Sequence, residues 1–259
     1  MKIALVDSGL GLLPAAAALR RLRPDVDLVL SNDPDGMPWG PRTSADIAEH
    51  ALACALAAAE HRPDALVVAC NTASVHGLEL LRAELEPGLP VIGTVPAIKP
   101  AAAGGGPVAI WATPATTGSP YQRALIAEFA GGAEVTEVAC PGLADAVECG
   151  DEAMIAAAVA DAAGRTPAGT AAIVLGCTHY ELVEQAIRTA VAARTAPGLT
   201  MYGSADAVAA QALRRIAARA GSAGTGRLTV LRSGRPEALP QAAAHYPEGR
   251  LITAPVPTA

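Results

Sequence analysis

Two short polar stretches, each directly after an apolar run, constrain the fold of this chain more than any other feature. The stretch Ala69–Ser74 (Ala-Cys-Asn-Thr-Ala-Ser) follows the run Ala-Leu-Val-Val, and the stretch Leu175–Tyr180 (Leu-Gly-Cys-Thr-His-Tyr) follows Ala-Ala-Ile-Val. Short runs of this kind are typical of buried strands in a parallel sheet. Each stretch is followed by Ala- and Leu-rich sequence with helical spacing. Cys70 and Cys177 are therefore predicted where a strand ends and a loop leads into a helix. Ligands of open α/β sheets bind at those ends, and a following helix N-terminus favours a thiolate.

A repeated pattern indicates that the chain holds two α/β units. The segment Val108–Thr113 resembles the start of the chain, with Thr113 in the place of Ser8. Cys177 follows Cys70 at nearly the same offset, 107 positions on. A constant offset for two separate elements suggests an internal duplication. We therefore predict two pseudo-symmetric α/β domains that face each other, each with a mainly parallel sheet flanked by helices, and one active site approached from two sides.

Charge and hydropathy exclude several classes of partner. The net charge of −6 gives no support for binding nucleic acid or acidic membranes. Every apolar stretch of transmembrane length contains charge, Gly or Pro, or is only weakly hydrophobic. The first residues, Met1–Asp7, carry too short an apolar run for a signal peptide. The expected location is the cytoplasm.

The cysteines and histidines argue against a metal site or a disulfide framework. The chain has 5 cysteines, an odd number, and contains no Cys-x-x-Cys pair. The 5 histidines do not fall at metal-ligand spacing from them. We expect no metal, and we interpret Cys54, Cys140 and Cys149 as structural.

Two opposed thiols can act as base and acid on the two faces of one carbon. The α-hydrogen of an amino acid is far less acidic than a thiol, so such a site must stabilise the developing enediolate by hydrogen bonds. Asn71, Thr72 and Thr178 lie beside the cysteines and could donate them. Asp7 and His179 could tune the thiols or relay their protons. The alternative is that both cysteines are ordinary core residues.

At these residues the sequence resembles the glutamate racemase family, within the cofactor-independent aspartate/glutamate racemase superfamily. The resemblance covers nearly the whole chain, and the two cysteine motifs are its most specific part. Its anchors are Asp7-Ser8-Gly9, Pro38-Trp39-Gly40, the two cysteine stretches, Val95–Pro100, and Ala112-Thr113 with Thr116.

The resemblance implies a domain division, a reaction and a set of roles. One domain would comprise residues 1–93 and 203–259, and the other residues 94–202, with the active site in the cleft between them. Cys70 would take the proton from the D-isomer and Cys177 from the L-isomer, without metal or other cofactor. D-glutamate for peptidoglycan would be the product, and a homodimer is compatible with this family. The implied catalytic residues are Cys70, Cys177, Asp7, His179 and Glu148, and the implied substrate-binding residues are Ser8, Pro38, Trp39, Gly40, Asn71, Thr72, Thr113, Thr116 and Thr178.

Several departures from the family pattern bear on the choice of substrate. The family commonly has tyrosine where this chain has Trp39, glycine at Leu12 and aspartate at Gly203. The loop 32–41 is rich in proline and glycine; it could present backbone N–H groups to an anion or merely connect two elements. Other readings are a racemase for aspartate or another small acid, a Cys-His amidase, or a non-catalytic racemase-like binding protein. A decarboxylase of the superfamily would typically keep a single cysteine.

Overall fold

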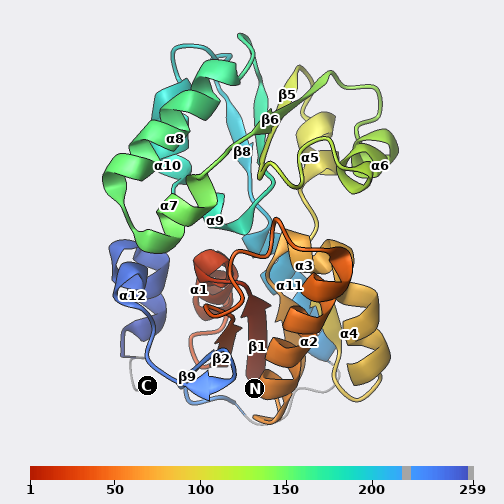
Figure 1. The fold of residues 1–259 in the computed structure, drawn as a ribbon, viewed down its shortest axis with the longest axis vertical. Coiled ribbons are helices and arrows are strands. Elements are labelled where there is room, and N and C mark those ends of the chain that lie inside the picture. The colour runs from red at the N-terminus through yellow and green to blue at the C-terminus, as the bar shows by residue number, and fades with distance from the viewer. Residues whose placement is uncertain (218–222, 256–259) are drawn as a thin grey trace. The chain divides into compact units, whose positions relative to one another are not determined.

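The computed structural model describes residues 1–217 and 223–255 (Figure 1). By their internal contacts the residues form two compact units, Met1–Thr94 with Ala205–Ala259, and Val95–Ser204. The Gly- and Ser-rich composition of residues 220–227 predicts a linker, which lies partly outside the described residues, as does the end of the chain. Each unit is a parallel sheet between two layers of helices.

The first unit contains a 6-stranded sheet in the order β10-β9-β2-β1-β3-β4. Only the short β10 pairs antiparallel; the other pairs are parallel. Helix α1 contacts both α11 and α12, while α2 contacts α3 and α4. The elements are β1 (Lys2–Asp7), η1 (Leu10–Leu12), α1 (Leu13–Leu22), β2 (Asp27–Asn32), α2 (Ser44–Ala59), β3 (Ala65–Val68), α3 (Asn71–His76), α4 (Leu78–Leu85), β4 (Val91–Gly93), α11 (Ala205–Ile216), β9 (Leu228–Arg232), β10 (Arg235–Pro236), η2 (Gln241–His245) and α12 (Pro247–Thr253).

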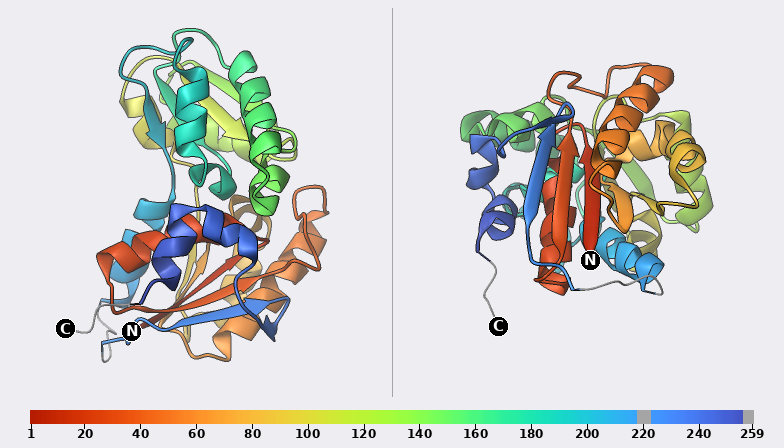
Figure 2. Two further views of the ribbon diagram at one scale, coloured as in Figure 1. Left: turned by 90° about the vertical axis from the view of Figure 1, so that its left-hand side faces the viewer. Right: turned by 90° about the horizontal axis from the view of Figure 1, so that it is seen from below.

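The second unit contains a 4-stranded sheet in the order β6-β5-β7-β8, with all pairs parallel. Helix α5 contacts α6, β7 and β8, while α8 contacts α7, α10 and β6. Figure 2 shows helices on both faces of this sheet. The elements are α5 (Ile98–Ala103), β5 (Val108–Ala112), α6 (Pro120–Phe129), β6 (Val135–Ala139), α7 (Leu143–Cys149), α8 (Glu152–Arg165), β7 (Ala172–Leu175), α9 (Thr178–Glu181), α10 (Glu184–Val191) and β8 (Thr200–Tyr202).

The two sheets share one topology. The order β2-β1-β3-β4 in the first sheet matches β6-β5-β7-β8 in the second. In each, the chain leaves the central strand toward one side and then returns to the other side. The crevice between those two neighbours, β1 with β3 and β5 with β7, is the switch point where doubly wound sheets bind ligands. The expected α/β fold with mainly parallel sheets is confirmed.

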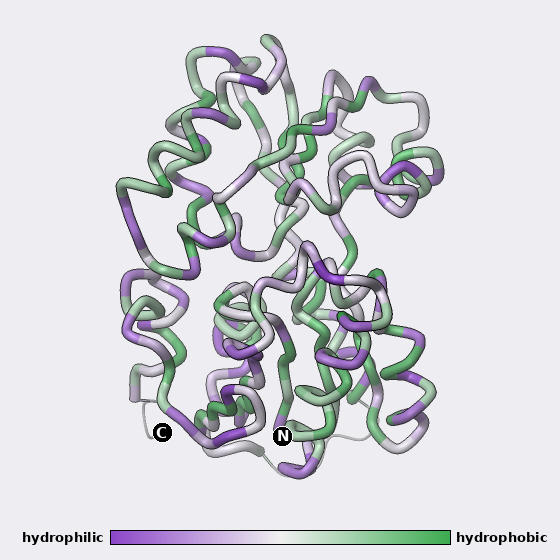
Figure 3. Tube along the Cα trace, viewed as in Figure 1, coloured by the Kyte–Doolittle hydropathy of each residue, from purple (hydrophilic) through white to green (hydrophobic). Residues whose placement is uncertain are grey.

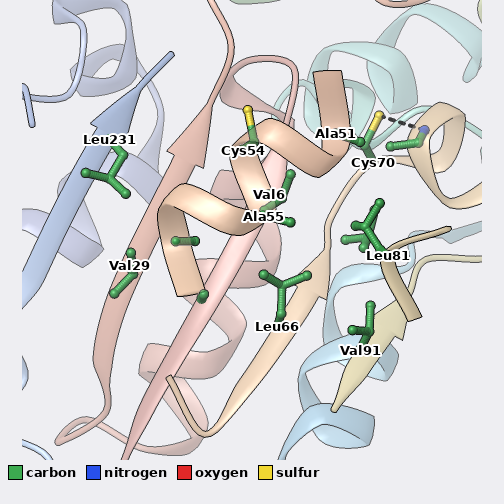
Figure 4. Packing of buried hydrophobic residues seen from close by; sticks show 14 of the residues in the cluster. Val6, Val29, Ala51, Cys54, Ala55, Leu66, Cys70, Leu81, Val91 and Leu231 are labelled. Carbon is green, nitrogen blue, oxygen red and sulfur yellow. Dashed lines mark hydrogen bonds between the residues drawn. The ribbon is translucent and has the colours of Figure 1, made fainter. Parts of the chain in front are cut away.

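The central strands of both sheets consist almost entirely of buried residues. In β1 the five residues Ile3–Asp7 are all buried, and β3 and β7 are buried throughout. One apolar cluster of the first unit joins α2 to the sheet through Ala51, Ala55 and Leu66 (Figure 4). Hydrophobic segments run along the strands, with hydrophilic ones in loops and on outer helix surfaces (Figure 3). Because the sheets are buried, polar chemistry is confined to the strand ends.

Candidate active site

The switch point of the first sheet holds Asp7 and Cys70. Asp7 is the last residue of β1, and the amide of Ala69, just after β3, donates to the Val6 carbonyl at 2.8 Å. The Asp7 side chain is fully buried, and its Oδ1 accepts a hydrogen bond from the Gly9 amide at 2.8 Å. The Ser8 hydroxyl lies 3.4 Å from the same oxygen. A buried carboxylate is thus held beside the cysteine's strand by its own turn.

Cys70 is the N-cap residue of α3. Its backbone is extended, and its Sγ accepts from the Ala73 amide at 3.5 Å, drawn as the dashed line in Figure 4. Only 7% of Cys70 is exposed, and Asn71 is also buried. The amides at the start of a helix have no partner within the helix and stabilise negative charge there. The sulfur therefore sits in a position suited to a thiolate.

The loop after β2 is held by the buried carboxylate of Asp33. Its Oδ2 accepts from the Trp39 indole Nε1 at 3.0 Å and lies 2.7 Å from His50 Nδ1. Its Oδ1 accepts from the Gly36 amide at 3.2 Å and from the Ser233 hydroxyl at 3.0 Å. The loop is therefore fastened to α2 on one side and to the end of β9 on the other.

This network changes the interpretation of Trp39. The side chain, expected to line a substrate pocket, is 1% exposed and gives its single N–H to Asp33. It therefore supports the loop rather than offering a donor to substrate. Pro38 is exposed and Gly40 half-buried, so the loop backbone stays accessible. Sequence reasoning missed Asp33 and His50, and the only signal was an acidic residue directly after a strand.

The switch point of the second sheet holds Thr113 and Cys177. Thr113 follows β5, and its hydroxyl lies 3.2 Å from that of Thr116. After β7, the Gly176 amide donates to the Trp111 carbonyl at 2.7 Å. A Cβ at Gly176 would approach that carbonyl oxygen to 2.8 Å, so only glycine fits there without a shift of backbone. This close approach sets where Cys177 leaves the sheet.

Cys177, His179 and Glu148 form a chain of groups that can move a proton. Cys177 is the N-cap residue of α9, and its Sγ lies 3.9 Å from His179 Nδ1. The other ring nitrogen, Nε2, lies 3.1 Å from Glu148 Oε2. If Nε2 carries the ring proton and donates it to the carboxylate, Nδ1 is left as an acceptor facing the sulfur. Thr178, between the two, is buried.

Glu148, to which the resemblance assigns a catalytic role, lies near the end of α7. Its side chain is 16% exposed and pairs with His179, whose side chain is 8% exposed. The helix α7 brings it to His179 from a distance of 31 residues along the chain.

The other cysteines differ from these two. Burial raises the pKa of both Cys54 and Cys140 to about 12, so these thiols stay protonated at neutral pH. Figure 4 shows Cys54 on α2 within the apolar cluster. Cys149, by contrast, is exposed. No group of three or more His, Cys, Asp or Glu side chains suited to a metal occurs within residues 1–217 and 223–255.

The fold and these residues define a class of enzyme. Each α/β unit carries one cysteine at its switch point, capping a helix and accompanied by a buried acid or by a His–Glu pair. Such a set suits proton transfer by thiols on a small anionic substrate. The comparisons with known proteins then give the family: residues 12–221 match the family model described as Asp/Glu/Hydantoin racemase, and the chain belongs to that family.

Curated relatives and solved structures agree with this assignment. The chain is 35% identical over 224 residues to a glutamate racemase of Herpetosiphon aurantiacus, covering 83% of this chain and 85% of that protein. It is 34% identical over 248 residues to a glutamate racemase of Pseudomonas putida KT2440, covering 92% and 90%. The crystal structure of Escherichia coli glutamate racemase in complex with L-glutamate and the activator UDP-MurNAc-Ala superposes with a TM-score of 0.81. That pair is 28% identical, with 94% of this chain and 91% of the other covered.

Proposed function

We propose that this chain is a cofactor-independent glutamate racemase that interconverts L- and D-glutamate with two cysteine bases. One observation carries the proposal: each of two sheets with the same strand order has a cysteine at its switch point, in the N-cap position of the following helix. The names of the curated relatives support glutamate as the substrate. Turnover without a metal or other cofactor, and the use of D-glutamate for peptidoglycan, are part of this proposal.

In the proposed mechanism one thiolate removes the α-proton and the other thiol returns a proton to the opposite face. Cys70 takes the proton from D-glutamate and Cys177 takes it from L-glutamate, so the two cysteines exchange protonation states in each turnover. Asp7 assists Cys70. His179, oriented by Glu148, receives or returns the proton at Cys177 through Nδ1, which lies 3.9 Å from the sulfur. The negative charge that develops on the substrate carboxylate is stabilised by N–H and O–H donors.

The proposed substrate-binding groups come from the carboxyl ends of strands in both sheets. The turn after β1, the start of α3 and the loop fastened by Asp33 contribute from the first unit. The Thr113–Thr116 pair and Thr178 contribute from the second. Trp39 serves through its bond to Asp33. The proposed set is Ser8, Pro38, Gly40, Asn71, Thr72, Thr113, Thr116 and Thr178.

The proposal extends to organisation and location. The two compact units would be the domains expected at 1–93 with 203–259 and at 94–202. No helix in the described part of the chain is long and apolar enough to cross a membrane. The enzyme would act in the cytoplasm, where its amino-acid substrate is available, and it would form a homodimer. Light scattering on the purified protein tests the dimer, and cell fractionation tests the location.

A circular dichroism assay tests which amino acid is the substrate. The purified protein, dialysed against chelator and given no cofactor, is mixed separately with L-glutamate, D-glutamate, L-aspartate and D-aspartate. Loss of the circular dichroism signal from both glutamate isomers, and from neither aspartate isomer, is the expected result. Activity on aspartate alone would replace the proposed substrate. Inactivity on all four, by protein with a native melting transition, would contradict a racemase and favour a non-catalytic relative.

A further inference from the structure

The second cysteine is followed by a helix too short to hold itself in place. Helix α9 is a single turn of 4 residues, Thr178–Glu181. A turn of this length makes few backbone bonds of its own, so its geometry depends on side-chain contacts. The Tyr180 hydroxyl donates to the Cys140 carbonyl at 3.3 Å, and His179 pairs with Glu148. Glu181, the last residue of the turn, makes a third side-chain contact.

The Glu181 carboxylate holds the segment after β8. Its Oε1 accepts from the Ser204 amide at 2.8 Å and from the Ser204 hydroxyl at 2.8 Å. Ser204 is 3% exposed and is the last residue of the second unit, directly before α11. Hydrogen bonds to a carboxylate are about twice as strong as neutral ones. The turn that carries the cysteine is thereby tied to the point at which the chain leaves the unit.

Gly203 leaves the space that this carboxylate needs. A Cβ at Gly203 would overlap Glu181 Oε2 and would lie 2.6 Å from Glu181 Cδ. The carboxylate is the end of a flexible side chain, so an alanine at 203 would push it off Ser204 rather than disrupt the backbone. Glu181, Gly203 and Ser204 therefore act as one fitted contact.

We infer that Glu181 is a positioning residue for the Cys177 base. It sits two residues beyond His179, and its bonds to Ser204 fix the turn in which the Cys177 sulfur and His179 Nδ1 face each other. This inference rests on the proposed function for the meaning of Cys177 as a base. The contact itself, and its effect on the thiol, do not depend on which substrate is turned over.

The test compares the reactivity of the cysteines in whole protein without substrate. Iodoacetamide alkylation of Cys177 is followed by mass spectrometry at one fixed pH, with the exposed Cys149 as internal reference. Glu181→Ala should change the Cys177 rate more than twofold relative to Cys149. Glu181→Gln keeps an oxygen that can accept both Ser204 bonds and should stay within twofold of the unsubstituted protein. Gly203→Ala should change the Cys177 alkylation rate as Glu181→Ala does. The double variant should change that rate no more than either single variant.

Racemisation provides the second readout. The kcat from L-glutamate should fall about tenfold in Glu181→Ala, and the primary deuterium isotope effect in that direction should rise as abstraction by Cys177 becomes slower. Glu184→Ala is the matched control, because Glu184 lies three residues beyond Glu181 and its carboxylate pairs with the half-buried Arg188. It should leave both the rate and the isotope effect unchanged. If Glu181→Ala does not fold, Ser204→Ala, which removes one of the two bonds, should show the same changes in smaller measure.

Two results would overturn the inference. One is a Cys177 alkylation rate in folded Glu181→Ala within twofold of the unsubstituted protein. The other is a Glu181→Ala/Gly203→Ala double variant in which the fold-change in the Cys177 alkylation rate equals the product of the two single fold-changes. That result would mean that Glu181 and Gly203 do not share one contact. Alkylation needs no glutamate, so either result is distinct from a failure of the proposed substrate.

Discussion

Replacing Asp33 by asparagine probes the network that fastens the loop after β2. The carboxylate has two donors on each oxygen: Trp39 and His50 on Oδ2, and Gly36 and Ser233 on Oδ1. An asparagine can accept on one side only. In either orientation its NH₂ faces one N–H that can only donate, the Gly36 amide on the Oδ1 side or the Trp39 indole on the Oδ2 side.

The magnitude follows from these four contacts. The two hydrogen bonds that the asparagine oxygen still accepts become neutral, which costs about 0.5–1 kcal/mol each. The N–H that faces the asparagine NH₂ loses its side-chain acceptor, which costs about 1 kcal/mol. The sum is a loss of about 2–3 kcal/mol in the free energy of unfolding. Trp39→Phe removes one donor and leaves the carboxylate its others, so about 1 kcal/mol is expected for that variant.

Urea unfolding followed by far-UV circular dichroism measures both losses. The KM for glutamate should also rise in Asp33→Asn, because the loop carries proposed substrate contacts, while kcat changes less. Ser44→Ala is a suitable control, since this exposed residue lies outside the network. A change below 0.5 kcal/mol for Asp33→Asn, on the scale typical of surface substitutions, would refute the assigned network.

Three further predictions follow from the site. Glu148→Gln should lower kcat about tenfold, since the bond to His179 loses its charge and about 1.4 kcal/mol, with stability nearly unchanged; steady-state kinetics measures this. Gly176→Ala should lower the melting temperature and kcat together, because the added methyl meets a backbone carbonyl, and scanning calorimetry with a rate assay tests it. Cys54 and Cys140, with a pKa of about 12, should resist iodoacetamide at pH 8 until the protein is unfolded in urea. These two thiols ionise near pH 9 only in the unfolded chain, so the free energy of unfolding should fall as pH rises from 9 to 11, by up to about 1.4 kcal/mol per pH unit for each thiol.

The sequence predicts those features of the fold that depend on local pattern. Apolar runs locate β3 and β7, and the polar residues after them locate both cysteines at strand ends. Boundaries that depend on tertiary context are less well predicted. The helical spacing after the first cysteine stretch is divided at Gly77 into two helices, α3 and α4. Helix α2 is capped by Thr43, whose hydroxyl accepts from the Asp46 amide at 3.3 Å.

The parts of the site that escaped prediction are contacts between residues distant in sequence. Ser233 reaches Asp33 across 200 positions, because β9 pairs with β2. The position of Glu148 beside His179 likewise depends on the packing of α7 against α9. No periodicity or spacing encodes such pairs. Side chains that accept hydrogen bonds from elsewhere in the fold become recognisable only once the strand order is known.

The most direct test of the two-base account is α-proton exchange in variants that lack one of the two proposed bases. Cys70→Ser and Cys177→Ser are incubated with each glutamate isomer in D₂O, and deuterium and configuration are followed by NMR and circular dichroism. We predict that neither variant racemises, that Cys70→Ser exchanges the α-proton of L-glutamate alone, and that Cys177→Ser exchanges that of D-glutamate alone. Racemisation by either variant at a rate near that of the unsubstituted protein would contradict the assignment of two cysteine bases.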